Sequence, residues 1–356
     1  FCKFILLLST IRQLFNKNSI LPSRNSSLCI EAGSKGWESI EFKELYQSAC
    51  EYLEPENVHQ FVVNQEENYL EQISSLLSAN RFTHYLYDPR TGSQKKWVGL
   101  WQSIKIGILL QKHNVVPIVL LTDLSVRTWR TQSSVISARR GIVVCFMSPK
   151  CVGPIFPHNR LLGPCPMPFS VKTKTMLEKV NSHRPKNSPI KAIFSGSLYE
   201  PRTTELKKIS SYLNDRGIKF EIKGREIGSP RAPDYEYWVG LCHVDIVLTT
   251  AAQMTQKGTD WTHIPHLVYR YLEVLACGTL LIAPEVPGIR RFFIPNEHFI
   301  PFDSPEQASD VVFNFINNDK ERHRIARQGK ERADAIISSR YFWMMVDASL
   351  GSDSLF

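Results

Sequence analysis

Hydrophobic residues recur along the chain in two alternating patterns, short apolar runs and longer segments with helical spacing. Runs such as FTHYLYD (82–88) and VVPIVLLTD (115–123) have the length and composition of buried strands. Between such runs, segments such as 39–53 and 97–113 place apolar residues every three or four positions, which predicts helices with a buried face. Strands that alternate with helices are typical of parallel sheets, so we predict an α/β fold.

The first half of the chain contains enough elements for one doubly wound, Rossmann-like domain. We predict strands at 26–32, 57–64, 82–88, 115–123 and 141–148, and helices at 39–53, 68–80 and 97–113. Prolines then crowd an irregular stretch, and a short helix follows it. We predict an interdomain linker at 180–189, which separates an amino-terminal domain (1–180) from a carboxyl-terminal domain (190–338).

The second half repeats the alternation. Strands are predicted at 191–196, 218–224, 245–250 and 279–284, and helices at 203–217, 234–244, 266–278, 304–318, 320–338 and 339–350. Gly217 and Gly278 follow the last apolar position of their helices, where glycine commonly ends a helix. A second Rossmann-like domain is therefore expected.

The composition agrees with two globular domains, and the net charge indicates which classes of partner the chain could bind. Hydrophobic residues make up 43% of the 356 residues, which is enough for two cores. The net charge of +9 suits an anionic partner, such as a nucleic acid, a membrane surface or a phosphorylated small molecule. No block of five or six Lys and Arg occurs, so we expect no nucleic-acid partner.

The eight cysteines form no CxxC pair, and no histidine stands beside them at metal-ligand spacing. We expect reduced thiols, a cytoplasmic location and no metal site. The first residues, FCKFILLLSTIRQLF, contain an apolar run too short to cross a bilayer. We expect a short helix that lies on the protein there, with an anchor at the inner face of the membrane as the alternative.

The stretch FSGSLYEPR (194–202) is a candidate phosphate site. A predicted strand ends at Gly196 and Ser197, and Arg202 precedes the next helix. Ligands of doubly wound sheets gather at the carboxyl ends of the strands, and a helix amino terminus favours an anion. The alternative is a plain strand-to-helix turn. Neither a GxGxxG sequence nor a P-loop sequence is present.

The stretch YRYLEVLACG (269–278) places two charged residues in an apolar helix. Arg270 and Glu273 are three positions apart and so share a face of the helix. On the local pattern alone, an ion pair between them is the favoured interpretation. The other interpretation is that the Glu273 carboxylate accepts hydrogen bonds from the hydroxyl groups of a ribose.

A longer pattern extends beyond this helix. RYLEVLACGTLLIAPEVPG is followed by NEHFIPFDSPEQA and then by DKERHRIARQGKER, and the three segments resemble the carboxyl-terminal domain of GT-B glycosyltransferases. The resemblance is greatest to the group-1-like family, in its spore-maturation-protein-like branch, and it covers about 191–343. FSGSLYEPR corresponds to the phosphate-binding loop of that domain, whereas the amino-terminal half is similar in architecture only.

The resemblance implies two Rossmann-like domains that face each other across a cleft, with the last helix (339–356) packed back on the first domain. It also implies transfer of a hexosyl or other sugar from a nucleotide sugar (enzyme class 2.4), with no cofactor and no metal ion. Gly196, Ser197 and Arg202 would then bind the donor phosphates and Glu273 the ribose, and Arg270 would either support the phosphate or orient Glu273. Relatives carry a second glutamate eight positions before it, where this chain has Pro265 and where His263 is a substitute candidate.

The amino-terminal domain would bind the acceptor, which is a glycan, a protein or a lipid, with peripheral membrane contact as an option. Candidate general bases at predicted strand ends are His84, Asp88 and Asp123. Further cleft candidates are Gly33, Gly36 and Arg90, and Arg127, Arg130, His158 and Arg160 could face an anion. The alternatives to an enzyme are a non-catalytic nucleotide- or glycan-binding protein of the same fold and, from charge alone, a nucleic-acid-associated protein.

Overall fold

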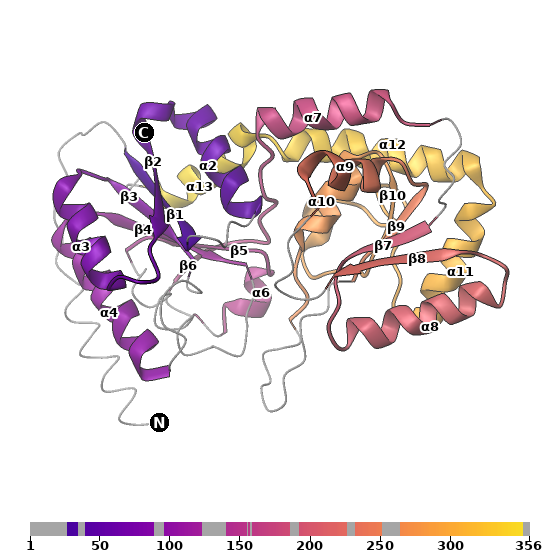
Figure 1. The fold of residues 1–356 in the computed structure, drawn as a ribbon, viewed down its shortest axis with the longest axis horizontal. Coiled ribbons are helices and arrows are strands. Elements are labelled where there is room, and N and C mark those ends of the chain that lie inside the picture. Colours follow the sequence, from indigo (N-terminus) through magenta and orange to yellow (C-terminus); the bar gives the residue numbers. More distant parts are fainter. Residues whose placement is uncertain are drawn as a thin grey trace.

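Two α/β domains lie side by side in the computed structural model (Figure 1). The structure describes residues 27–34, 40–88, 96–122, 140–154, 156, 159–185, 192–225, 232–250 and 264–351. Each domain contains one parallel sheet with helices on both faces, so the predicted α/β fold of two doubly wound domains is confirmed. The predicted helix over the first fifteen residues lies outside the described residues.

The amino-terminal sheet has six parallel strands in the order β2-β1-β3-β4-β5-β6. The strands are β1 (Leu28–Ser34), β2 (Val58–Val63), β3 (His84–Tyr87), β4 (Val116–Leu121), β5 (Ile142–Cys145) and β6 (Arg160–Leu162). The helices between them are α2 (Ile40–Leu53), η1 (Pro55–Asn57), α3 (Tyr69–Ala79), α4 (Lys96–Lys112) and α6 (Pro149–Val152). Parallel strands need such crossover connections.

Alternate residues of these strands enter two different cores, because successive side chains of a strand point to opposite faces. Leu28 and Ile30 belong to a cluster with α2, whereas Cys29 belongs to a cluster with α3 and α4. Both faces are therefore buried, which explains why β4 and β5 consist of hydrophobic residues without alternation.

The carboxyl-terminal sheet has four parallel strands in the order β10-β9-β7-β8. They are β7 (Ala192–Ser197), β8 (Phe220–Arg225), β9 (Ile246–Leu248) and β10 (Leu280–Ile282). The helices of this half are α7 (Val171–Ser182), α8 (Arg202–Asn214), α9 (Asp234–Cys242), α10 (Tyr269–Ala276), η2 (Ile289–Arg291), α11 (Pro305–Ile316), α12 (Asp319–Ile336) and α13 (Ser339–Leu350). One face of the sheet packs on α8, α11 and α12, and the other packs on α9 and α10.

Helix α7 contacts both halves of the chain. Residues 180–182, which are part of the linker that we predicted at 180–189, form the last turn of α7, and α7 packs against α9 of the carboxyl-terminal domain. Residues 186–189 of that linker lie outside the described residues. The amino end of α7 is held by α2, since the Glu44 carboxylate accepts hydrogen bonds from the Ser170 amide (2.6 Å) and the Thr173 hydroxyl (2.6 Å). A carboxylate at this position also suits the helix dipole.

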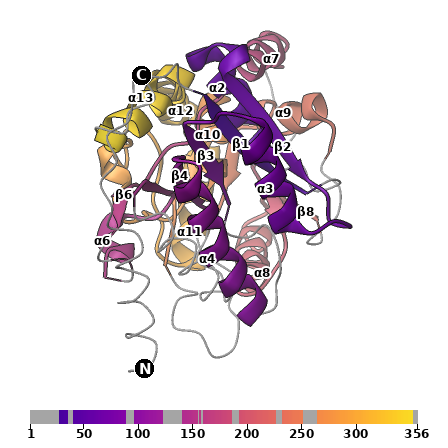
Figure 2. The same cartoon turned by 90° about the vertical axis from the view of Figure 1, so that its left-hand side faces the viewer.

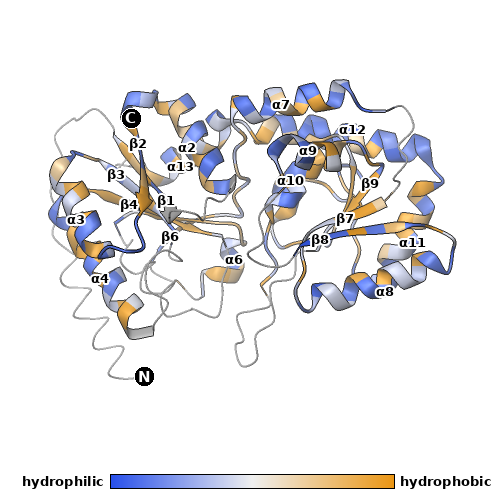
Figure 3. Cartoon of the chain, viewed as in Figure 1, coloured by the Kyte–Doolittle hydropathy of each residue, from blue (hydrophilic) through white to orange (hydrophobic). Residues whose placement is uncertain are grey.

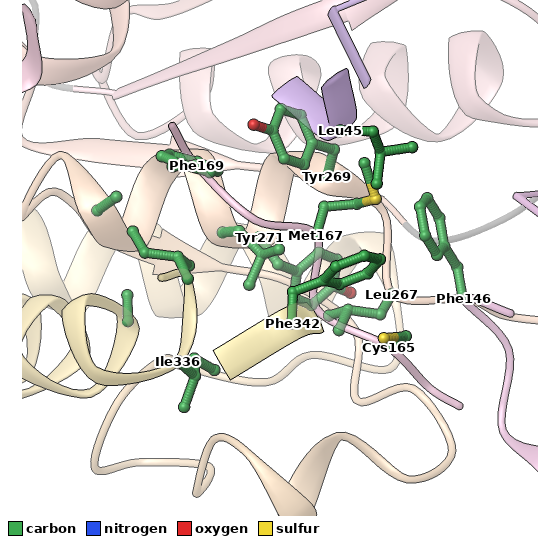
Figure 4. Packing of buried hydrophobic residues seen from close by; sticks show 14 of the residues in the cluster. Leu45, Phe146, Cys165, Met167, Phe169, Leu267, Tyr269, Tyr271, Ile336 and Phe342 are labelled. Carbon is green, nitrogen blue, oxygen red and sulfur yellow. The ribbon is translucent and has the colours of Figure 1, made fainter. Parts of the chain in front are cut away.

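The last described helix, α13, lies against the first domain. α13 packs on α2, β5 and β6, and the Trp343 indole donates a 3.0 Å hydrogen bond to the Ser48 hydroxyl. One cluster of buried residues joins both domains and the two segments between them (Figure 4). In this view, Leu45 of the first domain, Phe169 before α7, Tyr269 of α10 and Phe342 of α13 share one core.

The described cysteines carry free thiols, in agreement with the expected reduced state. Burial raises the pKa of Cys145 to about 12, so its thiol stays protonated and unreactive near neutral pH. Cys145 instead fills the core behind β5, where its thiol donates weak hydrogen bonds to the Met147 and Leu162 carbonyl groups.

A tight contact between the domains forms at Gly288, which has a left-handed backbone with φ of +86°. A Cβ atom at this position would lie 2.8 Å from Cδ of Pro164 and 3.5 Å from Cβ of Ser148, both in the first half of the chain. We expect Gly288→Ala to lower the free energy of unfolding by about 2 kcal/mol, measured by urea denaturation, because it adds a clash to the cost of the left-handed backbone.

Gly217 provides the matched control. It also has a left-handed backbone, with φ of +71°, but no atom lies within 4 Å of an added Cβ. Gly217→Ala should therefore lose only the backbone contribution of about 1 kcal/mol. Equal losses in the two variants would show that the contact with Pro164 tolerates a methyl group.

Candidate functional site

The carboxyl ends of β7 and β9 form the crevice of the second sheet. From β7 the chain passes to β8 on one side and then returns to β9 on the other, so the connections diverge between β7 and β9. Such a switch point is where doubly wound sheets bind their ligands. α8 starts beside it at Arg202, and α10 starts at Tyr269 (Figure 1).

Arg202 is fixed across this crevice. Its Nε donates a 2.7 Å hydrogen bond to the Thr250 hydroxyl, and its Nη1 donates a 3.0 Å bond to the Ser197 carbonyl. The guanidinium group also lies over the Tyr199 ring, 4.2 Å from its centroid. The side chain is buried, with 8% of the residue exposed. These contacts use part of the five N–H donors of an arginine, so Arg202 can still donate into the crevice.

The second cation of the site is Arg270, on the first turn of α10. Its guanidinium group lies over the Tyr237 ring, 5.0 Å from the centroid, and donates a short hydrogen bond to the Tyr237 hydroxyl. Burial lowers the pKa of Arg202, the nearby Tyr199 opposes this change, and the positive charge of Arg270 adds to the lowering. The two arginines are therefore near enough to interact electrostatically, although they are 68 positions apart (270 − 202).

Glu273 is buried next to Arg270. Its Oε2 lies 3.3 Å from Arg270 Nη1, and only 1% of the residue is exposed. The pair that the local pattern favoured is thus present in the structure. The ion pair with Arg270 holds the carboxylate in place, and the ribose contact stays a prediction.

Gly196 and Ser197 belong to β7, which extends one residue further than predicted. An added Cβ at Gly196 would lie 3.1 Å from Cζ of Phe194, so the position is tight on that side. The Leu198 amide donates to the Arg225 carbonyl (3.0 Å), and residues 198–201 connect the strand to α8. The end of β7 and the start of α8 thus place Ser197 directly against Arg202.

The candidate bases of the first domain occupy opposite edges of its sheet. Asp88 follows the last residue of β3, so it lies at the carboxyl edge, and it is buried with 1% exposed. His84 is the first residue of β3 and lies at the amino edge, where its Nδ1 is 2.9 Å from the Thr83 hydroxyl. We had predicted His84 at a strand end that faces the cleft, and its position does not suit that role.

The remaining site candidates are Gly33, Arg160 and a group outside the described residues. Gly33 lies near the carboxyl end of β1. The following candidates lie outside the described residues: Gly36, Arg90, Asp123, Arg127, Arg130, His158 and His263. Arg160, which we considered as an anion contact, donates to the carbonyl groups of Leu350 (2.7 Å), Gly141 (3.2 Å) and Arg140 (2.7 Å). Its role in the structure is to attach α13 to β6.

Sequence reasoning missed a buried carboxylate in the first domain. Glu31 on β1 is fully buried, and its Oε2 accepts hydrogen bonds from the hydroxyl groups of Tyr69 (2.7 Å) and Tyr85 (2.8 Å). Burial and the Glu31 charge raise the pKa of Tyr85, so this phenol stays protonated and continues to donate. A charged residue inside the apolar run SSLCIEA was the available signal.

Among the residues that the structure describes, no group of three or more His, Cys, Asp and Glu side chains could hold a metal ion. Among the described residues at the crevice of the second sheet, Arg202 and Arg270 are cationic, with Glu205 and Glu273 as acidic neighbours. This arrangement suits a ligand with phosphate groups.

Residues 205–341 match the family model described as "Glycosyl transferase-like". The match includes α10 and its Arg270–Glu273 pair, and it begins just after Arg202. The carboxyl-terminal half of the chain is therefore glycosyl transferase-like in sequence. No curated protein sequence matches the chain closely enough to count as a relative.

Solved structures match more than nine tenths of the chain. Anabaena HepE, crystallised with UDP and glucose, has a TM-score of 0.58 and 11% identity over 92% of this chain and 100% of that chain. Sucrose-phosphate synthase from Thermosynechococcus elongatus has a TM-score of 0.54 and 11% identity, with 92% and 98% covered. A glycosyltransferase from Rickettsia africae has a TM-score of 0.53 and 11% identity, with 93% and 98% covered. At such low identity these matches show the fold, which is GT-B.

Proposed function

We propose that the chain is a glycosyltransferase that moves a sugar from a nucleotide-diphosphate donor to an acceptor without a metal ion. The observation that carries the proposal is the convergence of Arg202, Arg270 and Glu273 at the switch point of a domain that matches glycosyl transferase-like sequences. The UDP and UDP-glucose complexes of HepE support a UDP-type donor. Assignment to the spore-maturation-protein-like branch and to a hexosyl donor stays a prediction.

The proposed chemistry follows from charge. Breaking the bond between the sugar and the diphosphate leaves negative charge on the leaving phosphate. Arg270 and the remaining donors of Arg202 stabilise that charge, and the positive end of the α8 dipole, directly after residues 198–201, adds to the effect. Cations that are fixed before the reaction need little reorganisation during it, and the contacts of Arg202 with Thr250 and Ser197 supply that fixation.

The acceptor is proposed to bind at the carboxyl edge of the first sheet. Asp88 is the described candidate for the general base there, since it directly follows β3. A glycan, protein or lipid acceptor each fits the present observations. The alternative function, a binding protein without catalysis, is less favoured, because residues 205–341 match a family model described as glycosyl transferase-like.

A ligand-binding experiment tests the donor. We expect UDP or UDP-glucose at about a hundred times its Kd to raise the melting temperature by about 5 °C in a thermal-shift assay. The same addition to an Arg270→Met variant should give a much smaller rise, because the phosphate loses a charged partner. Release of free UDP from UDP-glucose would then separate the enzyme from a binding protein. Absence of any shift with UDP, GDP or their sugars would refute the proposal.

A further inference from the structure

Helix α4 has a hydrophobic face on its outer side as well as on its inner side. The inner side packs in the first domain, where Ile106 and Leu110 join the cluster with α3 and β4. The outer side is exposed, with Val98 at 46%, Trp101 at 58% and Ile108 at 45%. Exposed large apolar residues that gather on one face commonly mark an interaction surface.

The exposed positions of α4 form a single stripe. Between residues 98 and 112 the exposed side chains are Val98, Trp101, Lys105, Ile108 and Lys112, each three or four positions from the next. This spacing places all of them on one face of a helix. The Lys105 ammonium group lies 5.5 Å from the centroid of the Trp101 ring, so cationic and apolar groups are mixed along the stripe.

The charge of this region has one sign. The sequence contains no Asp or Glu between Asp88 and Asp123, a stretch that includes the whole of α4 and five Lys and Arg residues. α4 lies at the end of the amino-terminal domain that is remote from the carboxyl-terminal domain (Figures 1 and 2). Figure 3, which is coloured by hydropathy, shows hydrophobic residues interspersed along the ribbon of α4. The stripe is therefore accessible to a large, flat partner.

We propose that the outer stripe of α4 (Val98, Trp101, Lys105, Ile108 and Lys112) docks the protein on an anionic lipid bilayer. Tryptophan and aliphatic side chains enter the boundary between headgroups and acyl chains, whereas lysine side chains keep their ammonium groups at the anionic headgroups. Lys105 and Lys112 lie on a helix that has no Asp or Glu of its own, and they complement such a surface better than they would a neutral protein partner. The inner side of α4 packs in the core of the first domain, so only the outer stripe of this 17-residue helix enters the interface.

None of the described helices is long and apolar enough to span a membrane, which leaves surface docking as the mode of contact for the described part of the chain. The docking surface belongs to the domain in which we place the acceptor. The proposal does not require the proposed transferase activity, since it rests on exposure and charge alone.

Vesicle co-sedimentation of the full chain tests the proposal. Vesicles of phosphatidylcholine with about one third phosphatidylglycerol should bind the protein, and vesicles of phosphatidylcholine alone should bind it at least about fivefold more weakly. The double variant Trp101→Glu/Ile108→Glu should lose about tenfold or more in partitioning, and Lys105→Glu/Lys112→Glu should lose binding most strongly at low salt.

Phe313→Glu is the matched control, because Phe313 is also an exposed apolar residue (38%) but lies on α11 of the other domain. It should bind vesicles as the unmodified chain does. Circular dichroism checks that each variant is folded. The proposal is wrong if anionic vesicles do not bind the chain, if binding survives the Trp101→Glu/Ile108→Glu change, or if light scattering shows that this face instead joins two copies of the chain.

Discussion

Glu273→Gln is expected to lower kcat/KM for sugar transfer, or for donor hydrolysis, about a hundredfold. The carboxylate is buried 3.3 Å from Arg270 Nη1, in the position where we propose that it accepts hydrogen bonds from the donor ribose. Hydrogen bonds to a charged group contribute about 1.5 to 3 kcal/mol, and loss of the negative charge also leaves Arg270 without its carboxylate partner. The affinity for UDP, measured by isothermal titration calorimetry, should fall about tenfold or more.

The experiment separates the donor role from a purely structural ion pair. A structural pair predicts a lower melting temperature with unchanged UDP affinity, and that result would contradict the ribose assignment. Glu331→Gln is the control, because Glu331 also faces an arginine, Arg327, at 3.9 Å, but both side chains are exposed on α12. It should leave both UDP affinity and melting temperature close to those of the unmodified protein.

Trp343→Ala is expected to lower the free energy of unfolding by about 4 kcal/mol, which corresponds to a fall of about 5 °C in melting temperature. Trp343 is fully buried on α13, and its indole is hydrogen-bonded to Ser48 of α2. Removing it leaves a cavity between the two helices and takes away the indole donor, although the Ser48 hydroxyl still donates to the Leu45 carbonyl. Differential scanning calorimetry measures the change.

The next residue in the sequence is the control. Met344 is 50% exposed, so Met344→Ala should alter stability by no more than about 0.5 kcal/mol. If the two variants melted at the same temperature, the contact between α13 and α2 would contribute little, and the described packing of the last helix would be wrong.

The helices and long strands of this protein could be predicted because their signals are local. α3 begins at Asn68, whose side chain accepts from the Leu70 and Glu71 amides, and α11 begins at Ser304 in the same manner. Gly278 ends α10 with a left-handed backbone. Each of these residues starts or ends a helix by contacts within a few positions in the sequence, so the helix boundary can be predicted from the local sequence.

The sixth strand could not be predicted, because its cause is distant. β6 has three residues and follows a run of prolines, and it forms by pairing with β5 and by the bonds from Arg160 to Leu350 and Arg140. None of these partners is close in the sequence. Short strands of this kind depend on tertiary contacts rather than on their own pattern.

The candidate site shows the same division. Arg202, Arg270 and Glu273 could be selected from two short motifs, but their supports could not. Thr250 holds Arg202 from 48 positions away, and Tyr237 holds Arg270 from 33 positions away. We predicted a strand over FTHYLYD (82–88), but β3 begins at His84. The apolar run alone does not show which of its residues pair with the neighbouring strands, so the sequence did not show that His84 is the first residue of the strand.

The shared core in Figure 4 has a consequence for attempts to dissect the protein. The Leu267 amide of the second half donates to the Phe146 carbonyl of the first half, and Phe169 contacts both Trp238 and Tyr269. A cut between the sheets would expose these apolar side chains on both fragments. The two sheets are separate in topology, but they form one cooperative folding unit, and each half expressed alone would be prone to aggregate.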